Sequence, residues 1–320
     1  MKGMNILRNK RIATIGDAMV VFNPSKTGPL RFVPSFERAV GGAELNFAIG
    51  VTRLDMEAKW ISCIGDDEFG KLIYNFARGE GIDVSHVLRT PHIPTSIYFK
   101  EIREDGAGKS FYYRNPSPLL ELTEDRIDES VLDDVDLLHI SGVYLAVCEH
   151  NIEVALKLIA LAQAKNIPIS FDPNLRLKLW TIEDARAVYE KVYPSINLLL
   201  TGQDEFELLF EGRTVKDVQE SYKIDEIIVK KGEQGATVYT ATEQYDREAF
   251  SVRAIDTVGA GDAFDAAYVY SYLNGDDIVE RLRLANGAGA LVATIKGDNE
   301  GLPSLQELRQ FIGDEKLIER

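Results

Sequence analysis

Towards its C-terminal end the chain reads Asp256-Thr257-Val258-Gly259-Ala260-Gly261-Asp262-Ala263-Phe264, and Asp265-Ala266-Ala267 follow directly. The small residues Gly259, Ala260 and Gly261 leave room for backbone N–H groups to crowd around an anion. The small-residue run after them predicts a helix, whose positive dipole end would point at the same place. This stretch therefore predicts an anion hole at the start of a helix.

Asp262 would stand in the first turn of that helix, beside the predicted anion hole. There a carboxylate can accept the proton of an attacking hydroxyl while backbone amides hold the oxygens of a transferring phosphoryl group. An aspartate at this position is also a common helix cap after a glycine turn. From the spacing alone, general base and helix cap are both open.

Working outward from this stretch, short apolar β-rich runs alternate with helix-like segments over most of the chain. The predicted strands are 11–16, 59–64, 136–141, 168–171, 197–200 and 226–230, and the predicted helices are 43–54, 70–79, 152–165, 182–193, 261–274, 277–296 and 304–312. Such alternation predicts an α/β fold with a mainly parallel sheet covered by helices.

Two stretches, 20–36 and 94–114, interrupt this rhythm because they are too polar and too closely spaced for central strands. In the second, the strand-like runs 95–102 and 109–114 flank Glu104-Asp105-Gly106, which predicts a β-hairpin turn. We expect both stretches to form a small antiparallel lid beside the main domain, over a binding site. A surface hairpin without a role in binding is the alternative.

The composition narrows the class of protein. With 36 basic and 51 acidic residues among 320, the formal net charge is −15, which disfavours nucleic acid and anionic membranes as partners. The two cysteines show no metal or redox spacing, and the start of the chain lacks a secretory signal pattern, so we expect a cytoplasmic protein. No histidine pairing suggests a metal site.

The nine residues from Asp256 to Phe264 resemble the C-terminal signature of the ribokinase-like (PfkB) carbohydrate kinases. The resemblance extends over nearly the whole chain and implies a single domain of residues 1–320 with a Rossmann-like sheet and a β-lid. It implies attack by a primary hydroxyl on the γ-phosphate of ATP, with Mg²⁺ bridging phosphate oxygens. Asp262 would remove the proton, and the amides of Gly259 to Gly261 would hold the developing charge.

Two N-terminal motifs are similar to the sugar-binding parts of this family. Gly16-Asp17 ends the first predicted strand, and Gly41-Gly42-Ala43-Glu44-Leu45-Asn46 opens the first predicted helix. Glycines permit close approach of a ligand, while carboxylate and amide groups suit sugar hydroxyls. The resemblance implies sugar contacts from Asp17, Gly41, Gly42 and Asn46. Without it, the two adjacent glycines would be an ordinary strand-helix turn.

Other segments resemble the nucleotide side of the family. The predicted nucleotide contacts are Glu205, Lys231, Gly232, Gly235, Asn286 and Gly289, with Glu205 also acting indirectly on Mg²⁺. Gly202 stands where the family usually has asparagine, so the role of that amide is in doubt. The alternatives are a first-turn helix charge for Glu205, solvated lysines at 230 and 231, and plain helix packing around residue 286.

For the substrate, Tyr98, Tyr112, Arg114 and Arg176 resemble the pattern of 2-keto-3-deoxygluconate kinases, which place aromatic hydroxyls and arginines on the substrate carboxylate. Charge-assisted hydrogen bonds from paired arginines suit such a carboxylate. Fructokinases share part of the pattern, so a fructokinase or another sugar kinase is the alternative, and a non-catalytic sugar- or nucleotide-binding regulator is a third. The family also implies a homo-oligomer formed through the lid, and a K⁺ requirement is open.

Overall fold

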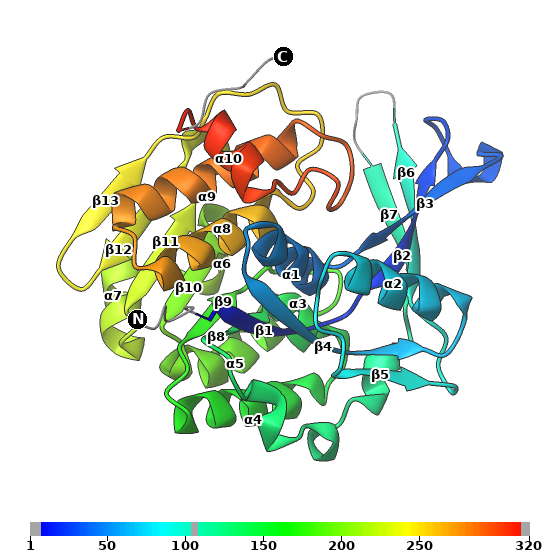
Figure 1. The fold of residues 1–320 in the computed structure, drawn as a ribbon, viewed down its shortest axis with the longest axis horizontal. Helices are drawn as coiled ribbons and strands as arrows, with labels where there is room; N and C mark the ends of the chain where they lie inside the picture. Colours follow the sequence, from blue (N-terminus) through cyan, green and yellow to red (C-terminus); the bar gives the residue numbers. More distant parts are fainter. Residues whose placement is uncertain (1–7, 104–107, 315–320) are drawn as a thin grey trace, which may run out of the picture.

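The computed structural model describes residues 8–103 and 108–314. Within this part, a nine-stranded sheet runs in the order β13-β12-β11-β10-β9-β8-β1-β4-β5 (Figure 1). The strands are β1 (Arg11–Ile15), β4 (Glu57–Gly65), β5 (Val87–Thr90), β8 (Leu137–Ser141), β9 (Ile169–Asp172), β10 (Leu198–Gly202), β11 (Glu226–Lys230), β12 (Ala236–Thr240) and β13 (Gln244–Arg247).

The sheet is parallel from β5 to β11, and β12 and β13 continue it antiparallel. Central strands such as β8 are buried along their whole length, as a parallel sheet covered on both faces requires. The predicted mainly parallel α/β fold is therefore confirmed.

Helices cover both faces of this sheet. The sheet therefore separates the apolar core into two large clusters. One cluster joins α1, α2, α8 and α9 to the sheet, and the other joins α3 to α7. The helices are α1 (Ala43–Arg53), α2 (Glu68–Gly79), α3 (Gly142–Val147), α4 (Asn151–Ala164), α5 (Ile182–Val192), α6 (Gln203–Leu209), α7 (Val215–Tyr222), α8 (Ala260–Asn274), α9 (Ile278–Ala293) and α10 (Leu305–Phe311). Short 3₁₀ turns lie at Leu30–Phe32, Pro118–Glu121, Glu124–Arg126, Glu129–Leu132, Tyr193–Ser195 and Gly232–Gln234.

Side-chain caps explain several of the helix starts. Thr181 and Asp184 form a capping box at α5, and Thr214 and Asp217 form another at α7. The predicted helix 277–296 ends earlier, at Ala293, because α9 gives way to a polar, glycine-flanked loop at 297–301.

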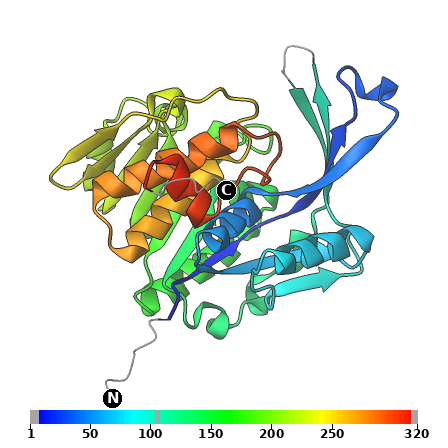
Figure 2. The same ribbon diagram turned by 45° about the horizontal axis from the view of Figure 1, so that its top comes forward.

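A second, four-stranded sheet stands apart from the main body, and Figure 2 shows it projecting on one side. Its order is β3-β2-β6-β7, with β2 (Met19–Pro24), β3 (Phe36–Gly41), β6 (Ile97–Ile102) and β7 (Gly108–Tyr113). The pairs β2/β3 and β6/β7 are antiparallel, and β2 and β6 are joined in parallel. The predicted turn at 104–106 lies outside the described residues.

Strand β3 lies almost wholly beyond the stretch 20–36 that we predicted for this sheet. After Phe36, the strand continues with two exposed charged residues, Glu37 and Arg38, so it lacks the continuous apolar pattern of a buried strand. Its burial does not alternate either, so a run of six residues carries little periodic signal.

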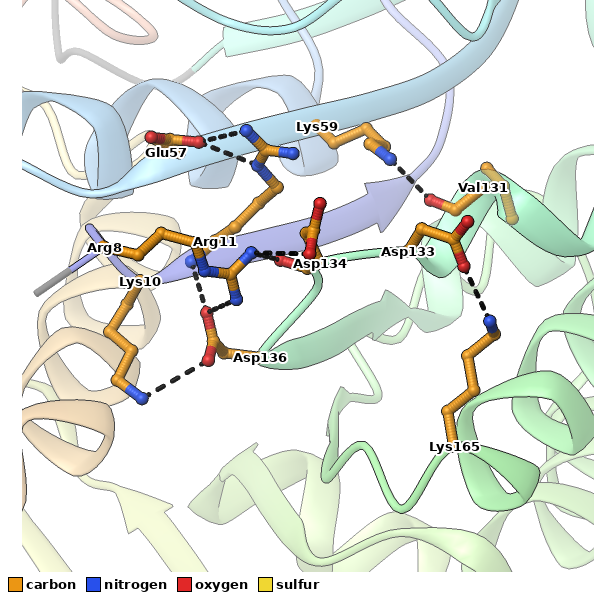
Figure 3. Close-up of polar contacts among 10 residues, drawn as sticks. All are labelled: Arg8, Lys10, Arg11, Glu57, Lys59, Val131, Asp133, Asp134, Asp136 and Lys165. Atoms are coloured by element: carbon orange, nitrogen blue, oxygen red, sulfur yellow. Dashed lines mark hydrogen bonds and ion pairs between the residues drawn. The ribbon is translucent and has the colours of Figure 1, made fainter.

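The amino ends of the central strands are closed by polar contacts (Figure 3). The Asp136 carboxylate accepts hydrogen bonds from the Arg11 backbone N–H (2.8 Å), from Arg8 (3.0 Å) and from Lys10 (3.3 Å). Because the Arg8 and Lys10 side chains in these pairs are exposed, the pairs hold the segment before β1 in place and do not form a binding site. The carboxyl ends of the strands, at the opposite edge, face the second sheet and hold the candidate site.

No helix in the described parts of the chain combines the length and the apolar character needed to cross a bilayer.

Candidate functional site

A cavity of about 1450 Å³ lies between the carboxyl edge of the main sheet and the second sheet. It exceeds the usual volume of a site for one small ligand, so it has room for two substrates side by side. The cavity brings together most of the residues predicted from the sequence: Gly42, Asn46, Tyr98, Tyr112, Arg114, Arg176, Glu205, Gly232, Gly235, Gly259, Ala260, Gly261, Asp262, Asn286 and Gly289. Within the described chain, Asp17, Gly41 and Lys231 are not on its wall.

The glycine turn that we predicted as an anion hole lies at the start of α8. Gly259 is the N-cap residue in the left-handed conformation, with φ of 79°. A Cβ atom there would lie 2.3 Å from the backbone oxygen of Asp298, so only glycine fits. The first amides of a helix lack partners within it. In α8 the Ala260 N–H donates to the Thr257 backbone oxygen (3.2 Å), and the next residues, Gly261 and Asp262, line the cavity.

Asp262 lies in the first turn of α8, partly buried on the wall of the cavity. The Asn46 side-chain amide, from α1, donates a hydrogen bond of 2.9 Å to its Oδ2. Burial raises the pKa of Asp262 to about 6, while the Asn46 hydrogen bond favours the charged form. At neutral pH it is therefore an ionised carboxylate with more than ordinary basicity. Because Gly259 is the N-cap residue, Asp262 is not the helix cap that the spacing alone left open.

The floor of the cavity carries a buried ion-pair cluster that the sequence prediction did not single out. Lys230, at the end of β11, places its Nζ 3.0 Å from Asp265 Oδ1 and 3.5 Å from Asp172 Oδ1. Burial alone would lower the pKa of Lys230, but the two carboxylates outweigh it and raise that pKa. The ammonium group lies directly beneath the glycine turn, 3.9 Å from where a Gly261 Cβ would be.

Lys231, which we predicted on the nucleotide side, lies elsewhere. Its Nζ contacts Asp246 Oδ1 at 3.2 Å, and its side chain lines a separate cavity with Arg213 and Tyr239. Neighbouring side chains of an extended chain point to opposite sides, so only Lys230 of the pair can face the main cavity. Of the two lysines considered for a phosphate contact, Lys230 is therefore the one that lines the main cavity.

Glu205 connects two loops at the nucleotide end. Its Oε1 accepts a hydrogen bond from the Leu175 backbone N–H (2.7 Å), and its Oε2 accepts one from Gly202 (3.1 Å). Burial and the neighbouring Asp172 raise the pKa of Glu205, and Lys230 opposes them. Glu205 thus positions the loop that carries Arg176. Gly202 contributes only backbone at the place where the family usually has an amide side chain.

Asn286 and Gly289 lie on α9 at the same end of the cavity. The Asn286 amide donates to the backbone oxygens of Arg247 and Glu248, both at 3.3 Å, and so holds the segment after β13 against the helix. Gly289 approaches the backbone of Ala260 closely, because a Cβ would lie 3.2 Å from its oxygen. Both residues therefore have a packing role as well as a place on the wall.

At the other end, the second sheet contributes Tyr98, Tyr112 and Arg114. The Tyr98 hydroxyl donates a 2.5 Å hydrogen bond to Asp298, whose other carboxylate oxygen pairs with Lys100 at 2.5 Å. The sequence analysis missed Asp298, which lines the cavity. The available signal was its place in a polar, glycine-flanked segment between two helices, Gly297 to Gly301.

Arg114 and Asp17 form a buried pair behind this wall, with Nη1 and Oδ2 3.8 Å apart. The guanidinium also lies over the ring of Tyr112, 5.5 Å from its centroid. Asp17 therefore supports Arg114 from behind instead of reaching the cavity. Gly41 packs against Asp298, because a Cβ there would lie 2.3 Å from the Asp298 carboxylate.

Comparison with known proteins identifies the family to which the chain belongs. Residues 9–305 match the family described as pfkB family carbohydrate kinase. A 2-dehydro-3-deoxygluconokinase of Thermoproteus tenax is 33% identical over 308 residues, 94% of each chain. A probable fructokinase-3 of Arabidopsis thaliana is 30% identical over 318 residues, 95% of this chain and 92% of that one.

The fold has a close counterpart among solved structures. A putative ribokinase II from E. coli, crystallised with ATP and Mg²⁺, superimposes with a TM-score of 0.88 at 29% identity, covering 96% of this chain and all of the other. The match over nearly the full length agrees with the anion hole, the buried carboxylate and the second sheet described above. The chain therefore belongs to the pfkB family of carbohydrate kinases.

Proposed function

We propose that the protein transfers the γ-phosphoryl group of ATP to a primary hydroxyl of a sugar acid, with 2-keto-3-deoxygluconate as the preferred substrate. The product would be 2-keto-3-deoxy-6-phosphogluconate. The observation that carries this proposal is the position of Arg114 and Arg176 on the wall of the cavity that also holds Asp262. Two guanidinium groups in an acidic protein form a local anion site that a neutral sugar does not need.

In this reaction the sugar hydroxyl oxygen bonds to the γ-phosphorus, ADP leaves, and the hydroxyl proton passes to Asp262. The amides at the start of α8 hold the phosphoryl oxygens as charge develops on them. Lys230, below the glycine turn, offsets the negative charge of the carboxylates around it.

Mg²⁺ fits this site as a partner of the nucleotide. Within the described residues, no three acidic, histidine or cysteine side chains form a metal cage. Mg²⁺ at such sites is held mainly by phosphate oxygens and water, with one or two carboxylates, and neutralises phosphate charge. Glu205 would act on Mg²⁺ indirectly, because both of its carboxylate oxygens already accept backbone hydrogen bonds. A K⁺ requirement is part of the proposal, and activity in tetramethylammonium salt equal to that in KCl would contradict it.

Fructose is the second candidate, because the Tyr98 hydroxyl proton is already donated to Asp298. A tyrosine oxygen in this state accepts a hydrogen bond from a ligand hydroxyl and does not donate to a carboxylate. The sugar-acid proposal therefore rests on the arginines and not on Tyr98. The regulator hypothesis is disfavoured because binding alone does not require a buried base beside an anion hole.

An ATP-consumption assay tests the proposal on 2-keto-3-deoxygluconate, fructose, ribose and nucleosides. We expect the highest kcat/KM on 2-keto-3-deoxygluconate. Arg114→Ala and Arg176→Ala should each lower kcat/KM on the acid by about 10- to 100-fold, the size of a lost charge-assisted hydrogen bond. The loss on fructose should be much smaller.

Lys178→Ala is the matched control, since Lys178 is another cation on the cavity wall. Equal losses on the acid and on fructose in both arginine variants would contradict carboxylate recognition. Absence of turnover on every sugar would contradict the kinase proposal itself.

We also propose that the protein is a homo-oligomer formed through the second sheet and resides in the cytoplasm. Strand β7 is an edge strand of that sheet and exposes the large side chains of Phe111 and Tyr113, 41% and 65% of their surface. Light scattering after gel filtration measures the mass, and a monomer at micromolar concentration would contradict the oligomer. Fractionation of cells tests the location.

A further inference from the structure

Glu44, in the first turn of α1, has an unusual environment for a carboxyl group. Its side chain is buried, and neither carboxyl oxygen has a hydrogen-bond partner within the described residues. Asp17 Oδ2 is likewise buried and without a hydrogen bond there. Buried polar atoms are nearly always paired, so two such carboxyl groups in one region require an explanation.

Close packing of the start of α1 against the end of β1 surrounds these two carboxyl groups. A Cβ atom on Gly16 would lie 2.2 Å from Glu44 Cγ, so the Glu44 side chain rests directly on the residue before Asp17. A Cβ atom on Gly42 would lie 2.5 Å from the Asp17 backbone oxygen. The glycines of both N-terminal motifs thus allow the start of α1 to press against the end of β1.

The charges around Glu44 come from four elements. Asp17 follows β1, Asp262 lies on α8, Arg114 follows β7, and the unpaired Tyr144 hydroxyl comes from α3. Glu44 and Asp17 are both buried and share the Arg114 guanidinium, whereas Asp262 also has Arg176 and Lys230 near it. Because burying an uncompensated charge is costly, these carboxyl groups cannot all be ionised.

Of these carboxyl groups, Glu44 is the one that is protonated at neutral pH. Burial raises its pKa to about 8, and the nearby Asp17 and Asp262 raise it further than Arg114 lowers it. Burial raises the pKa of Asp17 only to about 6, because Arg114 favours its charged form. At neutral pH, Glu44 is therefore a neutral acid with one O–H donor next to an ionised Asp17.

We propose that Glu44 is a positioning residue of the sugar site, a neutral acid that donates its proton as a hydrogen bond to Asp17, which in turn holds Arg114 at the cavity wall. The proposal rests on the sugar-binding role given to Arg114 under the proposed function. It assigns Glu44 no contact with substrate. It also accounts for both unpaired carboxyl groups with a single hydrogen bond.

Two substitutions of similar size separate this role from plain packing. Glu44→Gln keeps a neutral donor, whereas Glu44→Leu removes it. At pH 7 we expect Glu44→Gln to keep the sugar KM within about threefold of wild type, and Glu44→Leu to raise it by about 10- to 100-fold. The KM for ATP should change little in either variant, because Asp17 and Arg114 lie at the sugar end.

The pH dependence of the sugar KM separates the proposed role of Glu44 from a role in packing alone. Above about pH 8, the sugar KM of wild type should rise as Glu44 ionises beside Asp17, and Glu44→Gln should not show this rise. An equally raised sugar KM in Glu44→Gln and Glu44→Leu at pH 7 would overturn the proposal. An unchanged sugar KM in Glu44→Leu would also overturn it.

If Glu44→Leu does not fold, an infrared titration of wild type and Glu44→Gln tests the proposal instead. The wild-type minus Glu44→Gln difference spectrum should contain a neutral carboxylic acid band at pH 7 that disappears above about pH 8. Its absence at pH 7 would overturn the proposal. The kinetic arm uses whichever sugar the substrate assay identifies, and the infrared arm needs none, so failure of the proposed substrate is distinguishable from failure of this inference.

Discussion

Asp262 combines the two properties that a general base in this reaction needs. It is ionised at neutral pH, and its burial gives it a pKa of about 6, close to neutral pH. The hydrogen bond from Asn46 to its Oδ2 fixes the carboxylate on the cavity wall. A side chain held in this way loses little freedom when substrate binds.

Asp262→Asn should therefore lower kcat by about 10²- to 10⁴-fold with only a small change in the KM of sugar and ATP, because the lost role belongs to the transition state. Steady-state kinetics measure both parameters. Asp246→Asn is the control, since it makes the same chemical change in an exposed strand. Turnover near the wild-type rate in Asp262→Asn would contradict the base assignment.

The acid side of the pH profile should report the same group. Below about pH 6, Asp262 is protonated and cannot accept a proton, so kcat/KM should fall about tenfold per pH unit and level off above pH 6 to 7. Asn46→Ala removes a hydrogen bond to the charged form, which raises the pKa of Asp262 and moves this limb to higher pH. A limb at the same pH in both proteins would contradict the assignment.

At the residue scale, the sequence predicts most of the site because its motifs are contiguous. Asp262 and its glycines, Gly42 with Asn46, and Glu205 each belong to a short recognisable run. Lys230 and Asp298 do not. Whether Lys230 or its neighbour faces the cavity depends on how β11 ends, and Asp298 acts only through partners on the second sheet.

At the scale of elements, α8 is bounded by two glycines with nearly the same backbone conformation. Gly259 has φ of 79° and Gly275 has φ of 78°. The space around them differs. A Cβ on Gly275 would meet nothing within 4 Å, whereas one on Gly259 would lie 2.3 Å from the Asp298 backbone oxygen. The pair therefore separates the cost of the conformation from the cost of crowding.

Gly275→Ala should lower the free energy of unfolding by about 1 kcal/mol, the cost of placing a side chain in the left-handed region, with kcat unchanged. Gly259→Ala should lower it further and reduce kcat at least about tenfold, because the anion hole must shift. Urea unfolding and steady-state kinetics measure the two effects. Equal stability and activity in both variants would show that crowding at Gly259 has no consequence.

The elements themselves were predictable to different degrees. The buried parallel strands appear in the sequence as apolar runs, and their predicted bounds agree with β1, β8 and β11 to within a residue. Strand β3 was not predicted because two of its six residues, Glu37 and Arg38, are exposed and break its apolar run. Hydrophobic periodicity identifies a long helix that buries one face and a strand that is buried along its whole length. It is weak for a short strand at the edge of a sheet.

At the scale of the whole molecule, the site depends on contacts between distant parts of the chain. Tyr98 on β6 and Asp298 after α9 are 200 residues apart in sequence, and the same Asp298 backbone packs under Gly259. One loop thus connects the second sheet to the anion hole. No local pattern contains this information, so it could be seen only once the chain was folded.

The buried carboxyl group of Glu44 should also affect the stability of the whole molecule. Its pKa is about 8 in the folded protein, against an ordinary 4.5 expected for the unfolded chain. For an acid shifted upward, the favourable contribution is complete below pH 4.5 and is lost as the pH rises towards 8. Above pH 8 both states are ionised, so no further loss occurs.

Glu44→Gln does not titrate at this position and escapes that loss. The free energy of unfolding of the variant, minus that of wild type, should therefore rise between about pH 4.5 and 8 and then stay constant. The slope should approach about 1.4 kcal/mol per pH unit in the middle of this range. Urea unfolding at about pH 5, 6.5, 8 and 9 measures the difference, and Asp17 and Asp262 titrate in both proteins. Parallel stability curves would show that Glu44 is ionised in the folded protein.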